Sequence, residues 1–560
     1  MSSKSAKLKD LVHRTRRKAR HVDIISTIPT FLILRITYFL TASDIAALSS
    51  TCKGLRFAVV PVLFSHCWWK KRRGPPSNLW PFIRHLHVHA ERLEPRREFL
   101  RDLSQVTSLH VSGETITSGL ASILTAASNL DTLDLSCMSW RGPSSPIGCG
   151  NRNIWPDHKL IPAFPELSSR PTKVIFCSKL GPDYRRPHGR DFYQPRMLAQ
   201  RLTFATLLHQ LDVSRVEYLE VGLEALCLPC AVAYTWSSLR TLVLTGFWIQ
   251  DPVALEDRRV RTPPWIYEHI HLGTLIASAP RLRVLRVQWR RADDWCSESD
   301  DWPRPALLWP ADEEPDVPLM SLRELTLHNA APADGIFRRL PPNLRTLSLL
   351  EWPHSGFATS ARGLWHFETY DFDEDSVDDP PSIIMTGRRL MKALTIVPLP
   401  RLRELRISFY GLEDMRLFDH IATAFPRLRV LEIHAETSKD CLWRKERLVR
   451  SAFAKALAPL RHLRILRINA FRDVVEDDPP PRNPDAGILG EDIISALFGP
   501  LHSVRELWLP YSFTKGIKFH SARRGWEDPL SVRRDEKGGV WLEPMVGSTE
   551  DSRLEEDDDE

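Results

Sequence analysis

A short hydrophobic pattern, Leu-Arg-x-Leu-x-Leu or a close variant, recurs along most of the chain. Its last two apolar residues stand two positions apart, so both point to one side of an extended strand while the residues beside them point to the other. Clear copies occupy residues 83–88, 239–244, 282–287, 322–327, 344–349, 402–407, 428–433, 463–468 and 504–509, and looser copies occupy residues 106–111, 130–135 and 216–221. The pattern predicts a succession of strands, each with one face in a core.

Helices are predicted between the strands, and several of them stop at a proline, which lacks the N–H that would continue a helix. A proline follows each of the segments 272–279, 417–425, 448–458 and 488–499. Equivalent leucines are 23 residues apart from Leu86 to Leu109 and 22 apart from Leu325 to Leu347, within the roughly 20–29 of leucine-rich repeats. The chain therefore resembles the leucine-rich-repeat proteins. That resemblance implies an α/β solenoid with a parallel sheet on its concave face.

The repeat is irregular. Leu242 and Leu285 are 43 residues apart, and Leu285 and Leu325 are 40 apart, so each gap holds either an insertion or a repeat that the pattern does not reveal. Insertions are predicted at residues 143–195, 293–317 and 371–381. Phe247 and Arg290 stand where the family carries an asparagine after the third leucine. The solenoid is therefore expected to be uneven, without an asparagine ladder.

Residues 28–64 have the pattern of three short helices. Leu32, Ile36, Phe39 and Leu40 form one apolar stripe at helical spacing. Ser43 or Asp44 is the predicted N-cap of a second helix, which carries Ile45, Leu48 and Cys52 on one face, and a third helix is predicted from about Gly54 to Pro61. Fewer than forty residues bury too little surface to be stable alone. The helices are therefore expected to pack on a partner or on the domain that follows.

The same residues resemble the F-box family, whose motif runs Leu-Pro, an aliphatic helix, Asp-Leu, then Cys-Lys and Arg. The matching positions are Ile28, Pro29, Leu32, Ile36, Leu40, Asp44, Ile45, Leu48, Cys52, Lys53 and Arg56, followed by the tail-like residues 61–64. Phe31 stands where the family usually has an acidic residue. The resemblance implies docking onto the Skp-type adaptor of a cullin-RING ligase through Pro29, Leu32, Ile36, Leu40, Asp44, Ile45, Leu48 and Cys52. The alternative is a three-helix cap that only closes the repeat array.

Together the two resemblances imply an F-box/leucine-rich-repeat substrate receptor of an SCF-type ubiquitin ligase, a protein-interaction adaptor and not an enzyme. An unknown target protein would lie on the outward side chains of the strands. The predicted target-binding residues are Glu324, Thr326, Glu404, Arg406, Arg467, Glu506 and Trp508. Trp508 is the preferred anchor because large aromatic side chains dominate binding energies. The alternative function is a leucine-rich-repeat scaffold without a ligase role.

Charge and composition divide the chain further. The net charge is +6, but eight Lys and Arg lie in the first twenty residues and acidic residues fill 555–560. Segments of like charge with few apolar residues do not fold. The expected organisation is a basic disordered arm (1–23), the F-box-like module (24–70), the solenoid (79–515) and a C-terminal segment with an acidic disordered tail (516–560).

The expected compartment is nuclear or cytoplasmic. Nine cysteines without regular spacing argue against a disulfide framework. No apolar signal segment follows the basic start, and the most apolar run, residues 31–40, is too short to span a bilayer. No membrane association is expected.

Three groups of residues could carry chemistry, although no phosphate-binding loop, zinc-protease motif or nucleophile elbow is present. His85, His87 and His89 share one strand face and could bind a metal, but solvent-facing strand residues are the preferred interpretation. Cys227 and Cys230 form a lone Cys-x-x-Cys, interpreted as thiols packed in a repeat turn. No metal or other cofactor is expected.

The third group is the arginine at the second position of eight copies: Arg240, Arg283, Arg323, Arg345, Arg403, Arg429, Arg464 and Arg505. These arginines could meet an acidic ligand or RNA. Pairing with the chain's own acidic insertions is favoured, because the net charge is small and no aromatic residues alternate with the arginines. A nucleic-acid partner is not expected.

Overall fold

The computed structural model of the protein describes residues 28–69, 74–93, 95, 97–113, 115–138, 164–176, 190–247, 271–290, 307–310, 319–350, 385–396, 398–410, 415–436, 447–468, 499–508, 530–534 and 540–544. The chain divides into two compact units. Unit 1 comprises Met1–Ser139 and Pro165–Pro171, and unit 2 comprises Trp140–Phe164 and Thr172–Glu560. Among the described residues, no helix is both long and apolar enough to cross a membrane.

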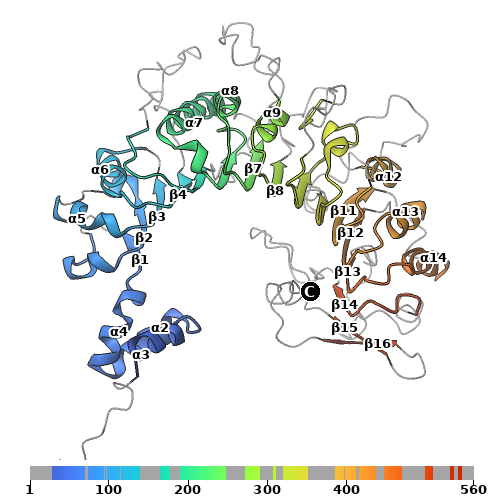
Figure 1. Ribbon diagram of the computed structural model, residues 1–560, viewed down its shortest axis with the longest axis horizontal. Coiled ribbons are helices and arrows are strands. Elements are labelled where there is room, and N and C mark those ends of the chain that lie inside the picture. The colour runs from blue at the N-terminus through green and yellow to red at the C-terminus, as the bar shows by residue number, and fades with distance from the viewer. Residues whose placement is uncertain are drawn as a thin grey trace, which may run out of the picture. The chain divides into compact units, whose positions relative to one another are not determined.

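In the described part of unit 1, a group of helices precedes a series of strands (Figure 1). The helices are α2 (Thr30–Thr37), α3 (Ala42–Thr51) and α4 (Lys53–Leu63). The strands are β1 (His66–Trp69), β2 (His85–His89), β3 (Ser108–Gly113) and β4 (Thr132–Met138), with α5 (Arg97–Asp102) before β3 and α6 (Ser118–Ala126) before β4. All four strands pair in parallel in chain order. The order strand, helix, strand is the one predicted.

The three predicted helices are confirmed, with two corrections to their ends. Thr41, not Ser43 or Asp44, is the N-cap of α3: its hydroxyl accepts the N–H of Asp44 at 3.3 Å, and the Asp44 carboxylate accepts the N–H of Thr41 at 3.2 Å. This reciprocal pair satisfies two backbone donors at once. The third helix does not stop at Pro61 but continues to Leu63. A proline removes one donor, yet the N–H of Phe64 still closes the last turn on the carbonyl of Val60 at 3.0 Å.

Among its described residues, unit 2 contains ten parallel strands in chain order and a final antiparallel pair. The parallel strands are β5 (Lys173–Phe176), β6 (Tyr218–Gly222), β7 (Thr241–Phe247), β8 (Val284–Arg290), β9 (Glu324–His328), β10 (Thr346–Leu350), β11 (Glu404–Tyr410), β12 (Val430–Glu436), β13 (Ile465–Ile468) and β14 (Glu506–Trp508). The last two strands are β15 (Leu530–Arg534) and β16 (Val540–Pro544).

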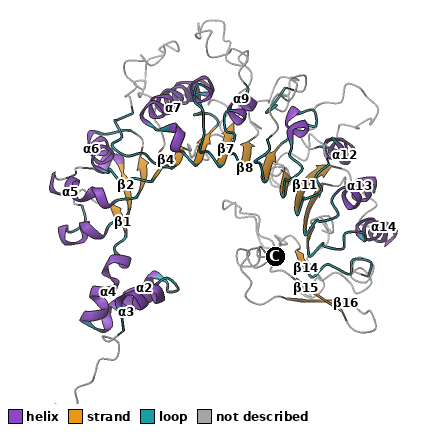
Figure 2. Cartoon of the chain, in the orientation of Figure 1, coloured by secondary structure: helices purple, strands orange, loops and turns teal. Residues whose placement is uncertain are grey.

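Among the described residues of unit 2, the helices lie on one side of the sheet (Figure 2). They are α7 (Arg190–Gln210), α8 (Leu228–Val232), α9 (Leu272–Ala277), α12 (Gly387–Thr395), α13 (Arg416–Ala424) and α14 (Arg447–Leu457). Three of the four predicted helices are confirmed within two residues at each end. The fourth, 488–499, lies almost entirely outside the described residues. The result is an open α/β repeat fold.

One leucine from each of β6 to β14 forms a single row, here called the leucine row. Its members are Leu219, Leu242, Leu285, Leu325, Leu347, Leu405, Leu431, Leu466 and Leu507, and each is the register partner of the next. All of them are at most 1% exposed. Burial of a leucine side chain contributes about 1.5–3 kcal/mol. The predicted strand face is therefore the core of unit 2.

The pairing resolves the long gaps. β7 pairs directly with β8, and β8 with β9, so the long gaps between their leucines place no further strand between these neighbours in the sheet. Residues 143–195, predicted to be an insertion, contain the strand β5, whose Val174 pairs with Leu219 of the leucine row. β1, β15 and β16 were not predicted. Of the other predicted insertions, 371–381 lies outside the described residues and 293–317 lies almost entirely outside them.

Gly246 near the end of β7 provides a test of this packing. Its φ is +100°, which L side chains rarely adopt, and an added Cβ would overlap the carboxylate of the buried Glu224. Gly246→Ala is therefore expected to destabilise unit 2 by more than about 1 kcal/mol. Hydrogen exchange of the β6 and β7 amides, compared with wild type, measures this. Unchanged protection would show that the strand end adapts.

Candidate functional site

The first candidate surface is the apolar stripe of α2. Ile33 and Thr37 of this helix pack inward, whereas Leu32 and Ile36, the neighbouring pair at the same spacing, are 39% and 49% exposed. Phe39, just after the helix, is 79% exposed. Successive residues of an α-helix are rotated by about 100° about its axis, so Leu32 and Ile36 point in a different direction from the residues that follow them, Ile33 and Thr37. Three of the four residues of the predicted stripe, Leu32, Ile36 and Phe39, are therefore at the surface and open to contact by another protein.

The buried core of the three helices is small. It consists of Ile33, Ile45, Leu55 and Val59. Further apolar residues packed against it are Ile28, Leu40, Leu48, Cys52, Ala58, Val62 and Leu63, all partly buried. Most of the module's larger aromatic side chains lie outside this cluster.

The predicted adaptor-binding residues therefore divide into groups. Pro29, Leu32 and Ile36 are exposed, and Leu40, Leu48 and Cys52 are half-buried. Asp44 is exposed and engaged in the cap of α3, where its hydrogen bonds with Thr41 lower its pKa. Ile45 is only 6% exposed, so its contribution to any binding is to hold the helices in place.

Three aromatic residues of the module are exposed beyond the predicted set. Phe31 of α2 and Tyr38, directly after it, are 67% and 85% exposed, and Phe57 on α4 is 79% exposed. Monomeric proteins rarely expose many large apolar side chains together. The aromatic content of residues 31–39 was the sequence signal for this patch.

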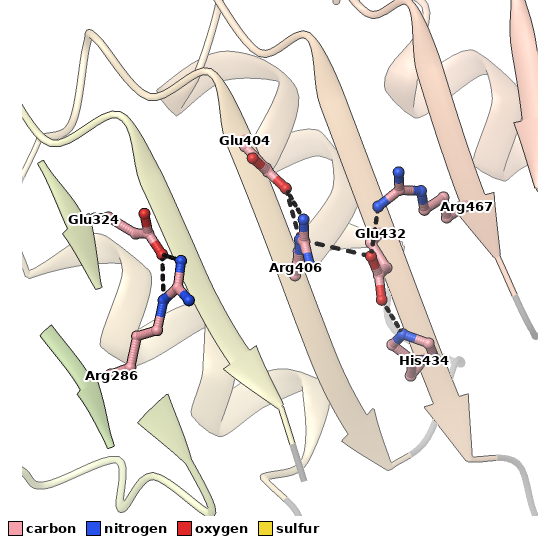
Figure 3. Close-up of polar contacts among 7 residues, drawn as sticks. All are labelled: Arg286, Glu324, Glu404, Arg406, Glu432, His434 and Arg467. Carbon is pink, nitrogen blue, oxygen red and sulfur yellow. Dashed lines mark hydrogen bonds and ion pairs between the residues drawn. The ribbon is translucent and has the colours of Figure 1, made fainter. Parts of the chain in front are cut away.

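The second candidate surface is the open face of unit 2, the side of its strands away from the helices (Figure 3). Acidic and basic side chains pair across neighbouring strands. Arg286 of β8 donates to Glu324 of β9 through Nε at 2.8 Å, and its Nη2 lies 2.7 Å from the same oxygen. Arg406 of β11 donates to Glu404 of the same strand at 2.6 Å. The face is thus charged but largely self-neutralised.

Glu432 on β12 is the centre of the most buried cluster on this face. Its Oε1 lies 2.6 Å from Nε2 of His434, and its Oε2 lies 3.2 Å from Nη1 of Arg467 and 3.7 Å from Nε of Arg406. Burial alone would raise the pKa of Glu432. The hydrogen bond from His434 and the charges of His434, Arg406 and Arg467 outweigh it and bring the pKa to about 2.

The predicted target-binding residues lie on this face with different exposures. Glu324, Thr326, Glu404, Arg406 and Glu506 are half-buried, whereas Arg467 is only 4% exposed. The placement of the Trp508 side chain is outside the described residues. Glu404, Arg406 and Arg467 are brought together, but through Glu432, which was not predicted; neither was His434. Glu432 is an outward residue of the copy at 428–433, and His434 is the next outward residue after that copy. The period of two along a strand could therefore have identified both.

Unit 1 carries a different row on its strands. Trp68, His87, His110 and Asp134 are register partners on β1 to β4. The Trp68 and His87 rings are parallel with centroids 4.2 Å apart, and the His87 and His110 centroids are 4.7 Å apart. Trp68 is 62% exposed. This Trp–His row is an aromatic surface that the sequence analysis missed, because β1 was not recognised as a strand.

An ion pair ends the Trp–His row. Nδ1 of His110 lies 2.6 Å from Oδ2 of Asp134. The hydrogen bond with Asp134 raises the pKa of His110. Burial would raise the pKa of Asp134, but its hydrogen bonds with His110 and Ser136 lower it. Burial lowers the pKa of His87, and nearby histidines lower it further.

The other candidate residues, the histidines of β2 and the two cysteines near α8, occupy ordinary structural positions. His85, His87 and His89 are half-buried on β2, and no group of three described His, Cys, Asp or Glu residues has the arrangement of a metal site. Cys227 and Cys230 are half-buried at the start of α8 with their sulfurs 2.8 Å apart. Hydrogen bonding to Cys230 lowers the pKa of Cys227 to about 7. The pair is thus a close dithiol in a repeat turn.

The Glu432 cluster makes a stability prediction. Glu432→Ala leaves Arg467 buried without its carboxylate and is expected to cost about 3–5 kcal/mol of unfolding free energy. Glu324→Ala removes a partner from the more exposed Arg286 and is expected to cost about 1 kcal/mol or less. Urea unfolding and hydrogen exchange of β11 to β13 compare the two.

The contribution of Glu432 is expected to depend on pH. Its folded pKa of about 2 lies below the ordinary 4.5, so its stabilising effect is present above pH 4.5 and is lost as the pH falls toward 2. The difference between wild type and Glu432→Ala should shrink over that range. Equal losses in Glu432→Ala and Glu324→Ala at neutral pH would contradict this account.

The Trp–His row makes a titration prediction. Asp134→Asn is expected to lower the pKa of His110, measured by NMR of the imidazole, and to leave the pKa of His85, set by burial and His66, unchanged. The ion pair stabilises the fold below the ordinary histidine pKa of 6.5, and this contribution is lost as the pH rises through the raised pKa. An unchanged His110 titration would refute the pairing.

Comparisons with known proteins found matches among solved structures alone. No family model matches the chain, and no curated protein does. The chain is similar to one in the crystal structure of the Rad7 and Elc1 complex in yeast, with 10% sequence identity and a TM-score of 0.25 over 84% of this chain and 94% of that one. A likeness of this size establishes neither a shared fold nor a shared function.

Proposed function

We propose that the chain is an F-box/leucine-rich-repeat substrate receptor: α2 to α4 dock onto a Skp-type adaptor of a cullin-RING ligase, and the strands hold a target protein for ubiquitylation. The observation that carries the proposal is the apolar stripe on α2. Leu32 and Ile36 are exposed although Ile33 and Thr37 on the same helix are buried. This is the exposure that docking through the F-box motif requires.

The energetics of the module support docking. Three helices with a core of four buried residues have little stability to spare. Covering Leu32, Ile36 and the exposed aromatic residues would bury apolar surface at about 25 cal/mol per Å². A partner that covers them therefore both binds and stabilises the helices. Proximity is the mechanism: a bound target has a high effective concentration at the ligase.

The strands offer two surfaces to a target. In unit 1, Trp68 is exposed and lies beside His87. Tryptophan is a residue type that often dominates binding energy. In unit 2, the paired charges of the open face suit recognition by charge complementarity more than by apolar burial. We propose Trp68 as a target anchor beside the predicted residues of unit 2. On this proposal the protein does no chemistry itself.

The test is binding of a recombinant Skp-type adaptor to the full-length protein. Leu32→Asp with Ile36→Asp is expected to weaken binding by about thirty-fold or more, as loss of a hot spot of about 2 kcal/mol does. Because both side chains are exposed, circular dichroism should show the helices retained. Titration calorimetry gives the affinities.

The matched control is Ala46→Asp with Ser50→Asp, which places two carboxylates at the same helical spacing on an exposed face of α3. It is expected to bind within about threefold of wild type. If wild type itself fails to bind the adaptor, or if the stripe variant binds as well as the control, the helices only cap the repeats and the scaffold function stands instead.

A further inference from the structure

The residue immediately before each strand from β7 to β14 is an arginine. These residues, here called the arginine row, are Arg240, Arg283, Arg323, Arg345, Arg403, Arg429, Arg464 and Arg505. All belong to unit 2 and occur at the beginning of a parallel strand, so they share one edge of the sheet. The leucine before them is buried in every copy from 239 to 463, and Val504 is buried in the last.

Backbone hydrogen bonds hold the arginine row in register. The N–H of each arginine donates to the carbonyl of the arginine before it, from Arg283 on Arg240 to Arg505 on Arg464, at 2.7–2.8 Å. The same carbonyl also accepts the N–H of the following residue, as Val284 donates to Arg240 at 2.9 Å. Neighbouring strands lie about 4.8 Å apart. The arginine side chains therefore start from backbone positions at a regular short spacing, which the pairing of the strands fixes.

The first four members are exposed side by side: Arg240, Arg283, Arg323 and Arg345. Among the described residues, Glu217 is the one carboxylate paired with any of them, 3.5 Å from Nη1 of Arg240, and both of these side chains are about half exposed. Nη1 of Arg323 donates to the carbonyl of Asn343 at 3.2 Å. The nearest acidic neighbour in sequence, Glu324, is already bound to Arg286.

This arrangement differs from that of the open face. There each of the three arginines Arg286, Arg406 and Arg467 has a glutamate within 3.2 Å. In the first four members of the row, like charges instead repeat on successive strands, where they repel one another. The buried leucines beside them supply the core contacts. Arg283, Arg323 and Arg345 are paired with no carboxylate of the described residues, so their charges are available for a ligand.

We propose that the arginine row, at Arg240 to Arg345, binds an acidic peptide segment of a partner protein that lies across the strands. Three strand spacings are about 14 Å, the length of four or five residues of extended peptide. Arginine pairs with carboxylates through two parallel N–H groups, which favours Asp and Glu as partners. The proposal concerns unit 2 alone and stands whether or not α2 to α4 bind an adaptor.

A nucleic acid fits this edge less well. Single-stranded nucleic acids bind on aromatic side chains that stack with the bases, between basic groups that follow the backbone. The residues on either side of the four arginines are Leu239, Thr241, Leu282, Val284, Leu322, Glu324, Leu344 and Thr346. None is aromatic. An acidic peptide requires no aromatic side chains for stacking.

Fluorescence anisotropy with the full-length protein tests the proposal. The probe is a labelled twelve-residue peptide of alternating Glu and Ser, and a peptide with Gln in place of Glu is the control ligand. The acidic probe is expected to bind and to weaken steeply with added salt. Arg283→Glu with Arg345→Glu should weaken binding at least about tenfold, and Arg283→Gln with Arg345→Gln should weaken it by less.

The matched control is Arg388→Glu with Lys392→Glu, which makes the same change in net charge at two exposed positions of α12. It should bind within about threefold of wild type. Equal weakening in both Glu variants, binding of the Gln peptide, or no binding to wild type (as when the chain's own acidic segments fill the row) overturns the proposal. So does tighter, row-dependent binding of an oligothymidine than of the peptide.

Discussion

The structure of unit 2 depends on one interaction, the stacking of a buried leucine from each strand on the leucine of the next. Each strand from β6 to β14 contributes one member to the leucine row, and the pairing register places neighbouring members side by side. Because a repeat contacts only its neighbours, no single residue organises the whole array. What matters is that each copy returns its leucine to the same position. The chain between two copies is otherwise free to vary.

This constraint explains why insertions are tolerated. The leucines of β10 and β11 are 58 residues apart, and those of β11 and β12 are 26 apart, yet both pairs have the same parallel register. Lengthening a loop costs little additional entropy, since the cost grows only with the logarithm of its length. The leucine row also leaves the outward positions and the residue before each strand free. Packing of the core therefore does not determine which charged residues occupy those positions.

The predictable part of the fold is the part encoded locally. All twelve copies of the repeat lie on strands, because the period of two and the leucines are visible in six residues. β1 and β5 were missed because His66–Trp69 and Lys173–Phe176 lack the Leu-x-Leu signal. The N-cap at Thr41 was missed although Thr41 and Asp44 have capping-box spacing, because Ser43 and Asp44 are themselves common N-cap residues. The antiparallel β15 and β16 have no repeat pattern at all.

The surfaces were less predictable than the fold. Leu32 and Ile36 were identified because a helical stripe is a local pattern, but their exposure depends on Ile33 packing against the other two helices. On the open face, Arg467 meets Glu432 across 35 residues of sequence, and no local pattern reports such a pair. The Trp–His row required four strands to be in register. Contacts between strands thus determine the sites, whereas contacts within a copy determine the strands.

The buried charges have a role that the leucine row cannot fill. Every strand presents the same leucine, so the row by itself does not distinguish one neighbour from another. A buried carboxylate such as Glu432 contributes little more stability than an apolar residue of its size would. Besides His434 of its own strand, it pairs with Arg406 of β11 on one side and with Arg467 of β13 on the other. A strand order that skipped β13 would separate Glu432 from Arg467, the two buried opposite charges of the cluster. We therefore interpret the Glu432 cluster as a set of contacts that specifies which strands are neighbours. The repeated leucines cannot specify this, because they are the same on successive strands.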